Sequence, residues 1–247
     1  MKKIYLIGGF GNNLFQVQKG LMSNEDIVYV VNIIKSKNLH KIIGWTYHEP
    51  TILSTTFIDD IAFVELPWIR VLFDFLFLSL SRIFNISIFG VSWEQEELTN
   101  TNFGYFQQKM NYNRWVEIEC CLDNHDQDLI ETPLVHVRMG DSPTLRQDLN
   151  KQINLMKKLG FNHYNIITNR PDEVVENFTG QPFSIDVVGG QVIDDFCLMR
   201  NAEILIIPQS TFSLFSALSN QNARSIYITG YKDQSFHQKF AKKVVHY

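Results

Sequence analysis

The chain has 247 residues, of which 45% are hydrophobic, so it can form one large domain or two small ones, each with a packed core. Its formal net charge of −4 at pH 7 argues against a nucleic-acid-binding protein, because such a protein needs a basic surface. The three cysteines, which include the adjacent pair Cys120 and Cys121, make neither a disulfide framework nor a metal cluster. We interpret them as core or surface thiols of a protein in a reducing compartment.

The first predicted strand, residues 3–7, leads into the glycine-rich segment Gly8-Gly-Phe-Gly-Asn-Asn-Leu-Phe-Gln16, and residues 17–22 are predicted to be helical. This apolar strand is too short for a signal peptide. A strand, a glycine-rich turn and a helix bring backbone amides close to a ligand, and the amide side chains suit a hydroxyl-rich one. A tight turn with an amide cap is the alternative. The candidate acceptor- or phosphate-binding residues are Gly9, Gly11, Asn12, Asn13 and Gln16.

Residues 27–34 form a second predicted strand, and residues 68–89 are the most apolar stretch of the chain. Asp74 and Arg82 interrupt this stretch, which argues against a membrane-spanning helix, because a spanning helix needs about 20 largely uncharged residues. We therefore predict an amphipathic helix buried in the fold, with a helix that lies on a membrane surface as the alternative. A short aromatic strand is predicted at residues 102–107.

A polar, turn-rich segment near residues 123–131 follows a predicted helix at 113–122 and marks the domain boundary. We assign residues 1–128 to an amino-terminal domain and residues 129–247 to a carboxy-terminal domain. In the second domain, predicted strands near 134–138, 163–168, 183–188, 203–207 and 225–229 alternate with predicted helices near 144–159, 171–178, 192–201 and 211–220. This alternation predicts an α/β fold in which helices cover both faces of a parallel sheet.

The segment Pro133-Leu-Val-His-Val-Arg-Met-Gly-Asp-Ser142 combines a buried strand with a turn and a helix start. His136 and Arg138 are two positions apart, so a strand directs both side chains to the same face. An arginine beside a helix amino terminus is suited to bind an anion, because the guanidinium grips two oxygens and the helix offers backbone amides. Pairing of Arg138 with Asp141 at the strand end is the alternative.

Other polar residues follow the ends of the predicted strands, where parallel sheets bind their ligands. Asn169 follows one strand, and Ser210, Thr211 and Ser213 stand at the start of a helix that follows another. Helix capping explains one of these hydroxyls but not all of them. Asp195 is a candidate acceptor of hydrogen bonds from a base such as guanine, with capping of the helix by Asp194 as the alternative account of this acidic pair.

Several short segments match one family in order and approximate spacing. The segment Gly8 to Gln16 is similar to Gly-Gly-Leu-Gly-Asn-Gln-Met-Phe-Gln, and Gly104-Tyr-Phe-Gln107 is similar to Gly-Tyr-Phe-Gln. His136-Val-Arg-Met-Gly-Asp141 is similar to His-x-Arg-Arg-Gly-Asp. Asp195-Phe-Cys-Leu-Met199 and Ser210-Thr-Phe-Ser213 are similar to Asp-x-x-x-Met and Asn-Ser-Thr-Tyr-Ser-Trp-Trp. Together they resemble glycosyltransferase family 11, the α-1,2-fucosyltransferases, in the bacterial branch that builds surface polysaccharides.

This resemblance implies a GT-B-like fold, in which two Rossmann-type domains with parallel sheets face a central cleft. It implies inverting transfer of L-fucose from GDP-β-L-fucose to the 2-hydroxyl of a galactoside, with no metal and no further cofactor. The implied partners are this GDP-sugar and a galactose-containing, lipid-linked glycan of O-antigen synthesis, with no nucleic acid. The implied location is the cytoplasm, at the inner face of the inner membrane, with a peripheral membrane contact.

By position, the resemblance assigns Arg138 to the diphosphate of the donor and places His136 and Asp195 near the guanine or ribose. The implied catalytic residues are Arg138 and Asp141, and His48 and Glu49 are further candidates for a base. The implied donor-binding residues are His136, Arg138, Asn169, Asp195, Ser210, Thr211, Phe212 and Ser213.

Three departures from the family motifs affect the donor prediction. Met139 replaces the second arginine, Gln209 replaces an asparagine, and the pair Leu214-Phe215 replaces two tryptophans. We expect an arginine restored at position 139 to leave the fold intact. A related GDP-deoxysugar such as GDP-colitose, a transferase with a different nucleotide sugar, and a non-catalytic nucleotide- or glycan-binding relative are the alternatives.

Overall fold

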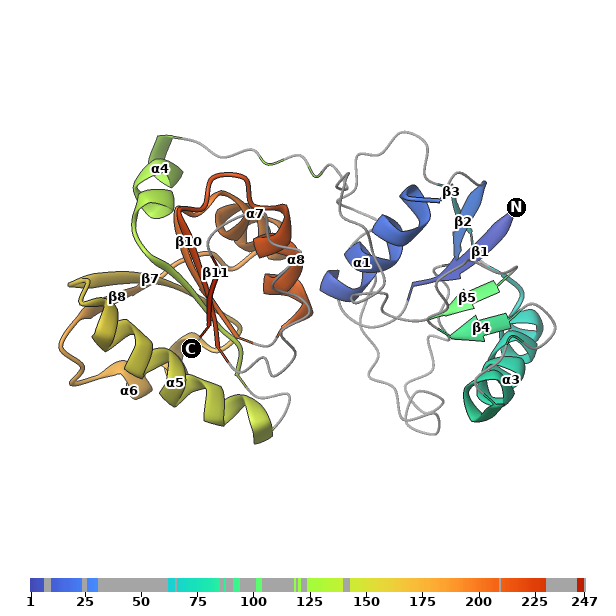
Figure 1. The fold of residues 1–247 in the computed structure, drawn as a ribbon, viewed down its shortest axis with the longest axis horizontal. Helices are drawn as coiled ribbons and strands as arrows, with labels where there is room; N and C mark the ends of the chain where they lie inside the picture. The colour runs from blue at the N-terminus through green and yellow to red at the C-terminus, as the bar shows by residue number, and fades with distance from the viewer. Residues whose placement is uncertain are drawn as a thin grey trace. The chain divides into compact units, whose positions relative to one another are not determined.

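The computed structural model describes residues 1–6, 10–23, 26–30, 62–64, 66–84, 87, 91–93, 101–103, 118, 120, 124–139, 143–208, 210–229 and 244–246. The chain forms two compact units, Met1–Glu119 and Cys120–Tyr247. Each unit contains one sheet whose described strand pairs all run parallel (Figure 1). The predicted α/β class with parallel sheets is therefore confirmed.

Unit 1 has a sheet of five strands in the order β3-β2-β1-β5-β4. These strands are β1 Lys2–Tyr5, β2 Ile27–Val30, β3 Ala62–Val64, β4 Val91–Trp93 and β5 Thr101–Phe103, and the described helices are α1 Phe10–Leu21 and α3 Trp68–Phe84. The strand order reverses on either side of the central β1. Helix α1 begins at Phe10, well before the predicted start at Val17, so the amide residues of the glycine-rich segment lie on a helix rather than in a loop.

Helix α3 packs on the sheet of unit 1 through Val71, Phe75 and Leu78, which join Tyr5, Val30 and Val91 in one core cluster. The Tyr5 hydroxyl donates a 2.7 Å hydrogen bond to the buried carboxyl of Asp74. The predicted helix is confirmed, but the prediction that it is buried holds for one face only. Its opposite face exposes large apolar side chains, including Phe73 and Leu76. Among the described residues, no helix is long and apolar enough to cross a membrane.

Unit 2 has a sheet of six strands in the order β11-β10-β9-β6-β7-β8. The strands are β6 Leu134–Val137, β7 His163–Thr168, β8 Ser184–Val187, β9 Ile204–Ile207, β10 Ser225–Ile228 and β11 Val244–His246. The helices are α4 Asn124–Glu131, α5 Pro143–Leu159, α6 Pro171–Phe178, α7 Val192–Asn201 and α8 Thr211–Ser219. The alternation predicted from residue 134 to about 229 is confirmed, while α4 and β11 were not predicted.

The strands of unit 2 use their two faces differently. Val135 and Val137 of β6 point into a core cluster with residues of α5 and α6, such as Met156 and Phe178. Side chains alternate along a strand, so His136 lies on the opposite face, where its ring packs edge-on against Phe212 of α8. Helices α7 and α8 pack against each other on that second face (Figure 1). The residues of β6 on the same face as His136 therefore lie toward α8, the helix that follows β9.

Two predictions about this region differ from the structure. The unit boundary falls after Glu119 rather than after residue 128, because α4 packs against α7 and so belongs to unit 2. Cys120 and Cys197 form a disulfide within unit 2, so the prediction that they are thiols is wrong for this pair. The two cysteines are 77 positions apart in the sequence, and the packing of α4 on α7 brings the segment before α4 close to Cys197.

Some predicted features lie outside the described residues. They are Gly9, the segment 45–50 with His48 and Glu49, the motif Gly104 to Gln107, the helix predicted at 113–122 apart from residues 118 and 120, and Asp141.

Candidate functional site

The strand order of unit 2 reverses between β6 and β9. The chain moves from β6 outward through β7 and β8, then returns to β9 and continues outward through β10 and β11. Within these described strands, β6 pairs with β7 through all four of its residues but with β9 through Leu134 and Val135 only. The two strands thus part as they approach the carboxyl edge of the sheet. In open parallel sheets this reversal is the usual place for a ligand.

Arg138 and Ser210 meet across this reversal. Arg138 follows the last residue of β6, and Ser210 precedes α8 in the segment that leaves β9. The Nη1 atom of Arg138 donates a hydrogen bond to Ser210 Oγ at 3.4 Å. This distance is long for such a bond, so the contact is weak and a ligand oxygen can replace it at small cost. Ser210 makes no side-chain capping bond to α8, and simple capping is therefore not its role.

His136 lies beneath Arg138 on the same face of β6. Its side chain is buried, and its ring lies 5.8 Å from that of Phe212. Burial and then the nearby charge of Arg138 lower the pKa of His136 to about 3, so the imidazole is neutral at neutral pH. Its Nδ1 atom has no hydrogen-bond partner among the described residues. A buried polar atom of this kind is normally satisfied by a ligand or an ordered water.

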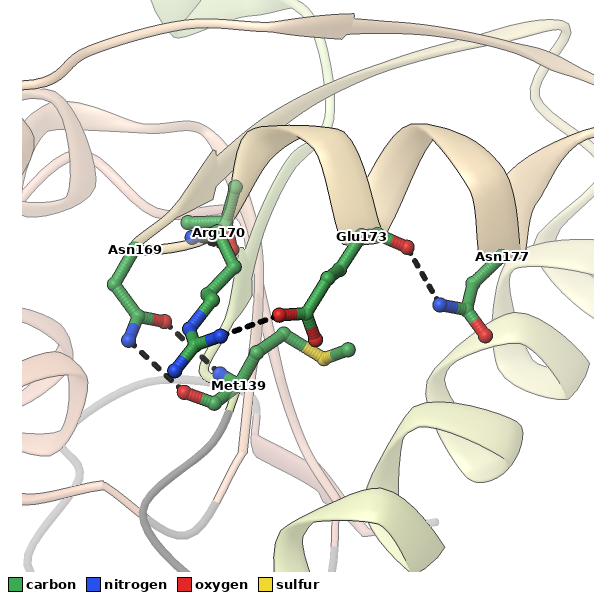
Figure 2. Close-up of polar contacts among 6 residues, drawn as sticks. Met139, Asn169, Arg170, Glu173 and Asn177 are labelled. Atoms are coloured by element: carbon green, nitrogen blue, oxygen red, sulfur yellow. Dashed lines mark hydrogen bonds and ion pairs between the residues drawn. The ribbon is translucent and has the colours of Figure 1, made fainter.

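Asn169 holds the backbone beside Arg138 through both ends of its side-chain amide. Its Oδ1 atom accepts a 2.9 Å hydrogen bond from the Met139 amide, and its Nδ2 atom donates a 2.9 Å bond to the Met139 carbonyl (Figure 2). The side chain thus links the two chain segments just beyond the ends of β6 and β7. Figure 2 also shows Arg170 in an ion pair with Glu173 at 2.6 Å. The structure shows that Asn169, predicted to bind the donor, fixes the backbone of the residue that follows Arg138.

Met139 directs its side chain into the hydrophobic core and not to the carboxyl edge. It is 6% exposed and belongs to the cluster that includes Leu149, Ile153 and Val174. The expectation that an arginine is tolerated here therefore conflicts with the structure, because a guanidinium at this position would enter an apolar layer between β6, α5 and α6.

Asp195 folds back on the turn between β8 and α7. Its Oδ1 atom accepts a 2.8 Å hydrogen bond from the Gly190 amide, and Gly189 and Gly190 adopt positive φ values of 84° and 137°. A Cβ atom on Gly189 would lie 2.0 Å from Asp195 Oδ1, so the close approach requires glycine. Burial is the main cause that raises the pKa of Asp195 to about 6, the charge of Asp194 adds to it, and the Gly190 amide opposes it.

Of the polar residues in the first turn of α8, some lie in the interior and others lie at the sheet edge. Ser213 is fully buried, and its hydroxyl donates to the Ser210 carbonyl at 3.4 Å. Thr211 and Phe212 are partly exposed. The first turn of α8 thus presents backbone amides and Thr211 beside Arg138, while Ser213 stabilises the turn from inside.

The glycine-rich segment of unit 1 follows β1, where the strand order of that sheet reverses. Asn13 and Gln16 are buried, and Asn13 Nδ2 donates to Gln16 Oε1 at 3.1 Å. Gly11 is buried in the first turn of α1, and Asn12 is partly exposed. Among these described residues, Asn12 is the partly exposed side chain, while Asn13 and Gln16 lie in the interior of unit 1.

The structure also shows residues that the sequence did not single out. Gln152 of α5 donates a 2.9 Å hydrogen bond to the His136 carbonyl, so β6 is anchored one residue before its end. The Gly189-Gly190 pair, visible in the sequence, signals the tight turn that receives Asp195. Among the described residues, no group of three or more His, Cys, Asp or Glu side chains is placed to hold a metal ion.

Comparisons with known proteins find similarity at the level of structure. No protein-family model matches the chain, and no curated protein matches it significantly. A crystal structure described as a family 9 glycosyl transferase from Veillonella parvula DSM 2008 is similar, with a TM-score of 0.48 and 11% identity, over 99% of this chain and 84% of that one. A similarity at this level supports no conclusion about activity. The resemblance to family 11 therefore rests on the short sequence motifs.

We expect Met139→Arg to lower the free energy of unfolding by about 2 kcal/mol or more, because it places a charge in an apolar layer. Met139→Leu conserves volume and polarity, so it should cost less than about 1.5 kcal/mol. Urea unfolding of both variants measures the difference. Equal stability of the two would show that position 139 does not face the core in solution.

Proposed function

We propose that this protein is an inverting glycosyltransferase that moves L-fucose from GDP-β-L-fucose to the 2-hydroxyl of a galactoside, without a metal ion. The observation that carries the proposal is the contact of Arg138 with Ser210 at the strand-order reversal of unit 2. This is where a parallel sheet binds a nucleotide, and both residues belong to motifs that resemble family 11. The family 11 resemblance supplies the identity of the sugar and of the acceptor.

The chemistry requires positive charge where a diphosphate departs. As the bond between the fucosyl C1 atom and the β-phosphate oxygen breaks, its electron pair passes to GDP and positive charge develops on the sugar ring. The acceptor oxygen forms the new bond to C1 from the opposite side, which inverts the configuration at C1, and its proton passes to a base or to water. Arg138 and the amides of the first turn of α8 are suited to stabilise the departing diphosphate.

The base of the nucleotide fits the other side of this edge. Guanine carries N–H donors on its Watson–Crick edge, and the carboxylate of Asp195 is an acceptor that keeps Oδ2 beyond its bond to Gly190. The buried Nδ1 of His136 offers a second polar contact for the ribose or base. In this proposal Asn169 and Gln152 act on the backbone of β6 rather than on the donor.

The acceptor is proposed to be a galactose-containing glycan, linked to a lipid carrier, that becomes part of a bacterial surface polysaccharide. Asn12 at the start of α1 is the side chain of unit 1 proposed to contact it. Asp141 either takes the proton of the acceptor hydroxyl or orients Arg138. Turnover with GDP-colitose but not with GDP-fucose would identify the alternative donor, and GDP binding without turnover of either would identify a non-catalytic relative.

Calorimetric titration should detect GDP binding and no comparable binding of UDP. At a hundred times its dissociation constant, GDP should add roughly 2.7 kcal/mol to the free energy of unfolding. Treatment with EDTA should leave affinity and turnover unchanged. A preference for UDP would contradict the assigned donor. Activity that EDTA removes and Mg²⁺ or Mn²⁺ restores would contradict metal independence.

We expect Arg138→Lys to be nearly as damaging as Arg138→Ala, with turnover reduced about a hundred- to a thousand-fold. Lysine keeps the charge but loses the planar fork that binds two phosphate oxygens. The effect should fall mainly on kcat, because the leaving diphosphate gains charge in the transition state. Arg224→Lys, at an exposed pair with Glu203, is the matched control and should behave as wild type. Near-normal turnover of the Arg138→Lys variant would remove Arg138 from the active site.

GDP affinity should fall as the pH drops below about 6, because protonation of Asp195 removes the charge that accepts the guanine hydrogen bonds. Because a single proton is involved, the GDP affinity should fall by at most about tenfold per pH unit. The terminal phosphate of GDP also titrates near 6, so the wild type must be compared with Asp195→Asn at each pH. The variant should bind GDP more weakly at neutral pH and show a shallower pH dependence. Parallel profiles for the two proteins would exclude Asp195 from the base site.

A further inference from the structure

Helix α3 of unit 1 exposes an apolar face to solvent. Eleven large hydrophobic side chains of the described residues are exposed, and six of them belong to this one helix: Ile69, Leu72, Phe73, Leu76, Ile83 and Phe84. Phe73 is 52% exposed, Leu76 54% and Ile83 73%. Contiguous apolar surface of this kind is uncommon on a soluble monomer and normally indicates a binding surface.

The exposed residues form a continuous face along the helix. Ile69, Phe73, Leu76 and Ile83 recur at intervals of three, four and seven positions, which places them on one side of an α-helix. The opposite side carries Val71, Phe75 and Leu78, which pack on the sheet. A helix that is apolar on two opposite sides requires two apolar environments, and the sheet of unit 1 supplies one of them.

The polar groups of α3 do not fit the usual pattern of a protein interface. Stable protein interfaces contain about one hydrogen bond per 100–200 Å². Ser79 is a hydroxyl on the exposed side, and it already donates a 3.0 Å bond to the Phe75 carbonyl of its own helix. A fluid hydrocarbon layer needs no directional partner, and the outer face of α3 suits such a layer better.

The charges of the helix favour an anionic surface. Its one acidic residue, Asp74, is buried, accepts a hydrogen bond from Tyr5 and forms a 3.3 Å ion pair with Arg70, whose side chain is more than half exposed. Arg82 is the remaining charged residue of the helix. The helix thus exposes no carboxylate to repel acidic lipid headgroups. With 17 residues, α3 is about 25 Å long, and its inward carboxyl is incompatible with a spanning orientation.

We propose that α3 docks unit 1 on the surface of a phospholipid bilayer that contains anionic lipids. The helix lies in the plane of the interface, with Phe73 and Leu76 among the acyl chains and Arg70 near the headgroups. This inference rests on α3 alone and does not depend on the proposed glycosyl transfer. Docking of this kind would hold the protein at the surface where lipid-linked molecules are found.

Co-sedimentation with vesicles tests the proposal on the full chain. The protein should bind vesicles of phosphatidylcholine with phosphatidylglycerol more tightly than vesicles of phosphatidylcholine alone, and salt should reduce the difference. The double variant Phe73→Ser, Leu76→Ser should lose about tenfold or more of the partition coefficient. Val175→Ser on α6 of unit 2, where Val175 is 51% exposed, is the matched control and should bind as wild type.

Several outcomes would overturn the proposal. They are failure to bind either vesicle, equal loss in the control variant, and equal binding to the two lipid compositions. A concentration-dependent dimer that the double variant abolishes, in the absence of vesicle binding, would instead assign this face to a second copy of the chain. GDP titration of the same samples separates the two hypotheses, because the double variant should keep the GDP affinity of the wild type whether or not vesicles bind.

Discussion

The reversal of strand order at β6 is the constraint on which the candidate site depends. β6 pairs with β7 to its end at Val137, but its pairing with β9 ends at Val135, so the pairing with β9 stops before the strand reaches Arg138. Two side chains stabilise the backbone where the strand pairing with β9 is missing. Gln152 bonds the His136 carbonyl, and Asn169 bonds both backbone groups of Met139. Arg138 is therefore held between two fixed backbone positions, which is how a long flexible side chain acquires a defined direction.

Burial decides which groups near this edge carry charge. His136 lies in the core with a pKa of about 3, so it contributes a neutral ring and no positive charge at neutral pH. Asp195 is only partly buried, and its pKa of about 6 leaves it ionised at neutral pH and protonated in mildly acidic solution. Arg138 remains cationic throughout this range. The edge thus combines a permanent cation with an acid that titrates near neutrality, a pairing suited to a ligand with a negative diphosphate and a donor-rich base.

The sequence predicted the second unit well because its elements are long and alternate regularly. Strands at 163–168 and helices at 171–178 and 192–201 agree with the structure to the residue. Three-residue strands such as Ala62–Val64 and Val244–His246 lack enough positions to show a period, so they were not predicted. The Cys120–Cys197 disulfide depends on the packing of α4 on α7, which no local pattern encodes. For the site, residue types identified Arg138 and Ser210. Alternation along β6 continues to Met139, which joins Val135 and Val137 in the core. The contacts of Asn169 with the Met139 backbone are tertiary, so no local pattern encodes them.

The two apolar faces of α3 raise the question of what fixes its rotation. Hydrophobic burial alone does not determine which face of α3 packs on the sheet, because burial of either apolar face would give a similar gain in free energy. The Tyr5–Asp74 hydrogen bond distinguishes them, since turning the helix over would leave the Tyr5 hydroxyl buried without its partner. Burial, followed by the effect of Asp74, raises the pKa of Tyr5 far above its ordinary value, so the hydroxyl stays a donor. One buried polar contact therefore determines which apolar face meets the sheet and, as a consequence, which one is left for the surroundings.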